Sequence, residues 1–148
     1  MKKLITVFVV FFITASQTLL ANDEVLTPAQ VKSSFETRYG NTTNAKWQKI
    51  KGVYVARFVE NGNDFEVYYS KHGELLAYSR FIPESYLPQL IADAISTQFP
   101  GFAITELLEF TSHKTGTTYF IHVENNNMEF YARAYSDAKI KILKRIKK

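Results

Sequence analysis

The sequence repeats one pattern of apolar residues, and this repetition constrains the fold more strongly than any other feature. Residues of the first half have counterparts of similar character either 60 or 65 positions later. The pairs are Val31 with Ile91, Phe35 with Ile95, Tyr39 with Phe99, Tyr54 with Tyr119, Phe58 with Val123, Leu75 with Ile140, and Phe81 with Ile146. In each half, a stripe of helical spacing precedes short runs of aromatic and β-branched residues. The pattern therefore predicts a tandem repeat of one helix and four strands.

Two such repeats can bury their apolar faces together in a single α+β domain. We expect one antiparallel sheet of about eight strands with both helices on one face, because sheets of this size are common. The predicted domain covers residues 22–148, with repeats at 27–82 and 83–148.

Start and stop signals place the two helices. Thr27 is a candidate cap, Pro28 suits the first helical position, and Gln30 would complete a capping box with Thr27. Gly40 is expected to end this first helix. The second helix is predicted to begin near Pro88 and to end before residues 100–101, a Pro-Gly pair.

The stretch between the helices has the pattern of an antiparallel meander. Asn61-Gly62 separates two runs of β-forming residues and is typical of a tight hairpin. By alternation within each strand, one face would pack on the first helix. That face comprises Ala45, Trp47, Tyr54, Ala56, Phe58, Val67 and Tyr69.

The first residues have the pattern of a signal peptide. Lys2 and Lys3 precede the apolar run 4–15, which is short for a membrane span, and Ala21 suits the last residue before cleavage. We expect residues 1–21 to be removed, leaving a periplasmic or secreted monomer with no stable membrane insertion. A retained membrane anchor is the alternative.

Charge and cysteine content narrow the classes of partner. Loss of Lys2 and Lys3 would lower the formal net charge from +4 to +2, so no nucleic acid partner is expected. The basic segment 144–148 follows an apolar strand and suits a solvated sheet edge. With no cysteine in the chain, an exported domain must be stabilised by core packing alone.

Several motifs together resemble the exported PepSY-like family of Bacteroidetes-type bacteria, which is also described as β-lactamase-inhibitor-like. The matching segments are Ala45-Lys-Trp47, Gly52-Val-Tyr-Val-Ala-Arg-Phe58, Asn61-Gly62, Phe65-Glu-Val-Tyr-Tyr69, Gly73-Glu-Leu75-Leu76, Leu87-Pro88 and Phe99-Pro-Gly-Phe-Ala-Ile104. The resemblance covers nearly all of the chain after residue 21. It implies the same tandem fold and the binding of a protein or peptide, with inhibition of a hydrolase as one form of that binding.

The sequence contains few residue patterns that would indicate catalysis, metal binding or a cofactor. No cysteine and no Gly-x-Ser-x-Gly motif is present, and His72, His113 and His122 are isolated from one another, so we expect no enzyme activity and no cofactor. His122 and Glu124 share a strand face, but no further histidine or cysteine lies near them, so no metal site is predicted.

The sheet face opposite the helices is the candidate binding surface. Its predicted binding residues are Arg57, Tyr68, Tyr78, Arg80, Phe120, His122, Tyr131 and Arg133. Aromatic and arginine side chains carry much of the energy of protein interfaces, although cross-strand aromatic pairs also simply stabilise sheets. The sequence thus predicts an exported, non-catalytic binding module. The alternatives are a carrier of a small ligand or envelope polymer on the same face, and a purely structural envelope protein.

Overall fold

The computed structural model describes residues 25–40 and 44–148, so the predicted signal peptide lies outside the described residues. The first repeat contains α2 (Ala29–Tyr39), β1 (Lys46–Ile50), β2 (Val53–Glu60), β3 (Asn63–Tyr69) and β4 (Leu75–Phe81). A short 3-10 turn, η1 (Glu84–Tyr86), leads into the second repeat. This contains α3 (Gln89–Gln98), β5 (Ala103–Ser112), β6 (Gly116–Glu124), β7 (Met128–Tyr135) and β8 (Ile140–Lys147).

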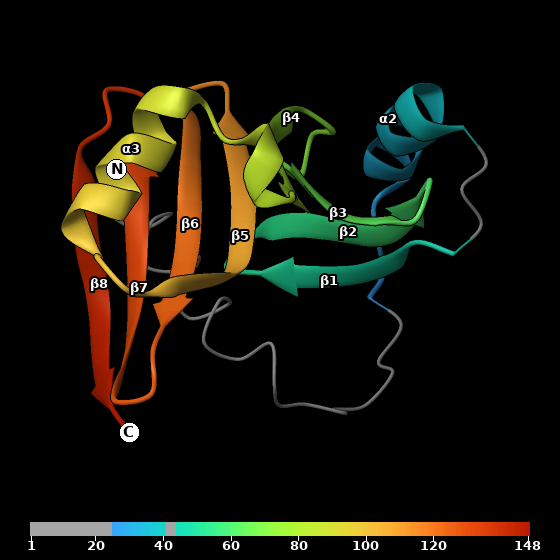
Figure 1. Cartoon of the computed structure of the whole chain (residues 1–148). Helices are drawn as coiled ribbons and strands as arrows, with labels where there is room; N and C mark the ends of the chain where they lie inside the picture. Colours follow the sequence, from blue (N-terminus) through green and yellow to red (C-terminus); the bar gives the residue numbers. More distant parts are fainter. Residues whose placement is uncertain (1–24, 41–43) are drawn as a thin grey trace.

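The eight strands form one antiparallel sheet in the order of the sequence, from β1 to β8 (Figure 1). In the view of Figure 1, β1 and β2 run nearly across the picture while β5 to β8 run nearly upright, so strand direction changes between the repeats. Accumulated strand twist has this effect in a continuous sheet. The predicted fold class, α+β with a tandem helix-plus-four-strand repeat, is confirmed.

Strand register places both helices on one face of the sheet. Residues directly opposite each other in an antiparallel pair point to the same side, and Val67 pairs with Tyr78, which pairs with Thr111. Val67 belongs to the core beneath α2, and Leu107, four positions before Thr111 on β5, belongs to the core beneath α3. We call this side the helix face and the opposite side the far face.

Two separate cores lie on the helix face. Val31 and Phe35 of α2 pack on β2 and β3, where Phe35 meets the Phe58 ring edge-on with centroids 5.2 Å apart. Ile91 and Ile95 of α3 pack on β5 to β7 in the same manner. The apolar stripes from which the helices were predicted are therefore the helix faces that are buried against the sheet.

The start of α2 differs from the prediction. The Thr27 hydroxyl donates to the Val25 carbonyl at 3.1 Å and makes no capping contact, and the helix begins after Pro28. The Pro28 carbonyl accepts from the backbone N–H groups of Val31 and Lys32 at 3.0 and 3.1 Å. Pro28 thus occupies the cap position, and the predicted capping box does not form.

A third apolar cluster lies on the far face. Its buried members are Val55, Tyr68, Ala77, Leu108 and Phe120, contributed by five consecutive strands from β2 to β6. The far face is therefore substantially apolar, and its cluster crosses the junction between the repeats. No helix in the described part of the chain is long and apolar enough to cross a membrane.

The turn between β3 and β4 packs closely on α2. Gly73 has a φ of +82°, and a Cβ built on it would lie 2.7 Å from both the Gln30 carbonyl oxygen and the Ser34 Oγ. The Gln30 side chain also donates to the Lys71 carbonyl at 3.0 Å. Gly73 is required here for two reasons: its left-handed backbone and its lack of a side chain.

We expect Gly73→Ala to destabilise the protein more than Gly62→Ala. Both glycines have φ near +80°, but a Cβ on Gly62 would meet no atom within 4 Å. Left-handed strain alone costs about 1–2 kcal/mol, and displacing α2 should add about 1–3 kcal/mol for Gly73. Urea denaturation of both variants measures the difference, and equal losses of unfolding free energy would contradict the packing described.

Tyr69 carries a hydroxyl group into the core beneath α2. The residue is 1% exposed, and its hydroxyl has no hydrogen-bond partner among the described residues. Burial, with a smaller contribution from Tyr39, raises the pKa of Tyr69 to about 12. The ionised form is thus disfavoured in the folded state, while an unfolded chain would release the proton near pH 10.

We expect Tyr69→Phe to be neutral or stabilising at pH 7, because it removes a buried polar group without a partner in the described structure. In the wild type, stability should fall as pH rises from about 10 to about 12, since the unfolded state loses the Tyr69 proton first. The variant should lose less over that range. Denaturation midpoints of both proteins at pH 7, 10 and 11 test this, and identical pH profiles would refute it.

Candidate functional site

The far face holds six of the eight predicted binding residues. Arg57 lies on β2, Tyr68 on β3, Phe120 and His122 on β6, and Tyr131 and Arg133 on β7. Cross-strand pairing brings Phe120 opposite Arg133 and His122 opposite Tyr131. The six side chains therefore share one side of the sheet. They form a packed row that crosses both repeats and a second group around His122.

Tyr78 and Arg80 lie on the helix face, and their predicted placement was wrong. They pair with Val67 and Phe65, which belong to the core beneath α2. A bulge at the end of β3 sets this register: Tyr68 pairs with Ala77, so Ala77 and not Tyr78 shares its side. Alternation within β4 separates its two sets of side chains, but only the register decides which set faces the helices.

The β2–β3 end of the far face carries a carboxylate with two partners. Glu66 forms an ion pair with Arg57, in which Oε1 lies 2.6 Å from Nε, and its Oε2 accepts a hydrogen bond from the Tyr68 hydroxyl. Burial, followed by the negative charge of Glu66, holds the pKa of Tyr68 well above its usual range. Tyr68 therefore stays protonated and acts as a donor that fixes the Glu66 carboxylate.

An aromatic row continues from Tyr68 across the junction between the repeats. The Tyr68 and Phe110 rings meet edge-on with centroids 6.0 Å apart, and Phe110 and Phe120 meet in the same way at 6.3 Å. Where these rings meet, strand β4 places the small side chains of Ala77 and Ser79 on this side, opposite Tyr68 and Phe110. These small residues leave room for the larger rings to meet across β4.

Arg133 closes the row at β7. Its guanidinium lies over the Phe120 ring at 4.5 Å from the centroid and reaches the Tyr135 ring at 6.0 Å. Tyr68, Phe120 and Arg133 are only 6%, 2% and 7% exposed. Tyr68 and Arg133, two of the predicted binding residues, are therefore packed into the far face, as cross-strand partners of a sheet are.

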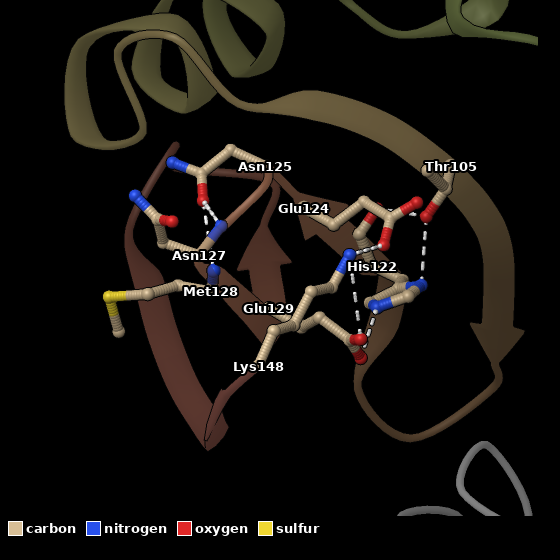
Figure 2. Close-up of polar contacts among 8 residues, drawn as sticks. All are labelled: Thr105, His122, Glu124, Asn125, Asn127, Met128, Glu129 and Lys148. Atoms are coloured by element: carbon tan, nitrogen blue, oxygen red, sulfur yellow. Dashed lines mark hydrogen bonds and ion pairs between the residues drawn. The ribbon is translucent and has the colours of Figure 1, made fainter.

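The other group surrounds His122 near the β6–β7 hairpin and is partly exposed. His122 and Tyr131 stack face to face, with centroids 4.3 Å apart and an interplanar angle of 8°. Figure 2 shows the polar contacts of the two ring nitrogens: Nδ1 lies 2.8 Å from Thr105 Oγ1, and Nε2 lies 3.3 Å from Glu129 Oε2. Burial and the nearby carboxylates raise the pKa of Tyr131.

Lys148 joins this group at the C-terminal end of β8. Its ammonium nitrogen lies 2.5 Å from Glu124 Oε2 and 3.7 Å from Glu129 Oε1 (Figure 2). The hydrogen bond from Lys148 lowers the pKa of Glu124. His122, Glu124 and Glu129 place atoms that can bind a metal ion within 4.8 Å of one another. Glu129 thus adds a third possible metal ligand to His122 and Glu124, which were expected to share a strand face.

The sequence prediction did not include Glu129, although a signal for it is present. Asn125 to Asn127 form the hairpin tip, where Asn125 Oδ1 accepts from the N–H groups of Asn127 and Met128, each at 2.9 Å. Counting outward from the two central residues, Asn126 and Asn127, places Asn125 opposite Met128 and then pairs Glu124 with Glu129. Thr105 and Lys148 carry no such signal, because they reach His122 and Glu124 only through pairing of β5 and β8 with the hairpin.

Comparisons with known proteins identify the fold. No protein-family model and no curated protein sequence matches the chain. A solved structure from Bacteroides eggerthii, described provisionally as a periplasmic protein, is 18% identical with a TM-score of 0.70, covering 82% of this chain and 88% of that one. A DUF2874 family protein from Bacteroides uniformis is 16% identical with a TM-score of 0.69, covering 81% and 88%.

A BLIP-like protein, that is, one resembling a β-lactamase inhibitor protein, extends this likeness. It comes from Bacteroides fragilis and is 15% identical with a TM-score of 0.63, covering 81% of this chain and 85% of its own. The β-lactamase-inhibitor-like part of the resemblance seen in the sequence is thus supported, and the matches do not bear on its PepSY-like part. This chain has the fold of the DUF2874 and BLIP-like proteins of Bacteroides.

Proposed function

We propose that the protein is an exported, non-catalytic binding module that docks one protein or peptide partner on its far face. The observation that carries this proposal is the composition of that face: β2, β3, β5, β6 and β7 place aromatic or arginine side chains on it, while α2 and α3 pack on the other side. Such side chains supply most of the energy in protein interfaces because they bury large area at low entropic cost.

The far face has the graded exposure of a docking surface. Tyr68, Phe120 and Arg133 form its packed centre, and Arg57, Phe110, His122 and Tyr131 are half-buried around it. A partner would contact the half-buried residues first, and the packed centre would hold them in fixed positions. Preorganised side chains lose less conformational freedom when a complex forms.

The similar structures agree with this role. One of them is described as BLIP-like, which supports a hydrolase as the class of partner to test first. Another is provisionally assigned to the periplasm, which agrees with the predicted export. Because a fold alone does not determine function, inhibition is tested separately from binding.

We expect a photo-crosslinking residue at position 131 to capture the partner in the native cell envelope, whereas the same residue at position 78 should not. Both native residues are half-buried tyrosines in the middle of strands, but they lie on opposite faces of the sheet. The captured protein is then identified and purified, and its affinity for each variant is measured by titration. Tyr131→Ala should then weaken the complex by about 1–3 kcal/mol, and Tyr78→Ala should leave it unchanged.

Equal capture from both positions, or capture from position 78 alone, would refute the choice of face. Thermal melts of both alanine variants serve as the folding control.

Inhibition has its own assay. Purified protein is added to a β-lactamase that hydrolyses a chromogenic cephalosporin, and the initial rate is measured. A rate that falls to zero near one equivalent supports the inhibitor form of the proposal. An unchanged rate excludes that hydrolase as the partner and leaves the crosslinking result to decide on binding.

A further inference from the structure

We propose that the β6–β7 end of the far face is a binding site for a divalent transition-metal ion, with Zn²⁺ as the ion that suits its donors best. The ligands would be His122 Nε2 and one carboxylate oxygen each from Glu124 and Glu129 (Figure 2). This inference does not depend on the proposed function, because it rests only on contacts within the β6–β7 hairpin and between the hairpin and its neighbours Thr105 and Lys148.

The backbone brings the three ligand atoms together. His122 and Glu124 are two positions apart on β6 and so point to the same side, and Glu129 lies directly opposite Glu124 on β7. The hairpin bonds from Asn125 hold this register. All three ligand atoms lie within 4.8 Å of one another. Small rotations of the two glutamates would place each atom about 2.0–2.2 Å from a Zn²⁺ ion held between them.

Thr105 prepares the imidazole for a metal. Its hydroxyl lies 3.3 Å from the His122 carbonyl oxygen and donates to it, which leaves Thr105 Oγ1 to accept a hydrogen bond from Nδ1–H at 2.8 Å. With a metal ion on Nε2, the proton of His122 would therefore lie on Nδ1. In metal sites, the non-ligating ring nitrogen of histidine commonly donates to such a partner, which fixes both tautomer and ring orientation.

This tautomer aims the lone pair of Nε2 at the carboxylate. Nε2 lies 3.3 Å from Glu129 Oε2, and two acceptors facing each other need a positive group between them. Either a proton or a metal ion meets that need. The stacked Tyr131 ring covers one face of the imidazole and keeps it in the plane where Nε2 meets Glu129.

Lys148 supplies a positive charge to the two carboxylates in the structure as it stands. Its ammonium group bridges Glu124 and Glu129, so these two carboxylates already share one cation. The Lys148 side chain is 35% exposed, so its long flexible chain can leave when a metal ion binds. Lys148 would then act as a competitor that lowers metal affinity.

The donor set favours Zn²⁺ over Mg²⁺ and Ca²⁺. Imidazole nitrogen and carboxylate oxygen are both zinc ligands, whereas the harder cations prefer oxygen donors alone. Three protein ligands leave a fourth position for water or for a side chain of a bound partner. The site adjoins Tyr131, so a bound metal would lie within the far face.

Isothermal titration of the metal-free protein with ZnCl₂ tests the proposal. We expect one Zn²⁺ per chain in the wild type and in His113→Ala, where an exposed histidine of the β5–β6 turn is removed as the matched control. His122→Ala and Glu129→Gln should each weaken binding by more than about 100-fold. Thr105→Val should weaken it about 10- to 100-fold and keep the stoichiometry, as expected of a residue that positions the ligand.

Lys148→Ala should tighten binding severalfold, which distinguishes this site from any other zinc-binding group on the chain. Thermal melts show whether each variant is folded. The shift of the His122 Nε2 resonance in ¹⁵N NMR should follow the titration in the wild type. The proposal is overturned if neither the wild type nor Lys148→Ala binds one equivalent of Zn²⁺, or if His122→Ala binds it with wild-type affinity.

Discussion

The pairing of β4 with β5 is the constraint on which the rest of the structure depends. Five residue pairs, from Ala77 with Ser112 to Phe81 with Leu108, join the two repeats into one sheet. Their register carries the inside and outside of the first repeat into the second, so both helices cover the same face. A slip of one residue at this seam would move α3 and its core to the opposite side.

The same pairing creates the far-face cluster. It places Ser79 opposite Phe110, while Ala77 pairs with Tyr68 on the other side of β4, so two small side chains separate the large rings of β3 and β5. Tyr68, Phe110 and Phe120 meet over it as a row of edge-to-face rings. Aromatic pairs of this kind contribute about 0.5–1.5 kcal/mol beyond their buried area. The seam is therefore stabilised from the far face, while the two helix-face cores remain separate.

The far face combines two regions with different physical character. Around Tyr68 and Phe120 it is packed and apolar, with Glu66 neutralised by Arg57. Near the β6–β7 hairpin it is polar and partly exposed, with His122, two glutamates and Lys148 in mutual contact. The first region suits a stable docking platform, and the second suits a charged or metal-dependent contact at its rim. Partner docking and metal binding are thus proposed for one surface, but each has its own test, and the failure of one does not refute the other.

The sequence by itself determined the elements and their repetition, because helical and two-residue periodicities are local properties of the chain. The stripe of Val31 and Phe35, the Asn61-Gly62 hairpin and the offset pairs were enough to predict a tandem α+β fold with one antiparallel sheet. Glu129 was within reach of the same counting. Tertiary structure alone decided that Tyr78 and Arg80 face the helices, because a bulge at Tyr68 and Tyr69 sets the register of β4. It alone brought Lys148 and Thr105 to the His122 group, since those contacts join strands that are distant in sequence and depend on pairing rather than on any local pattern.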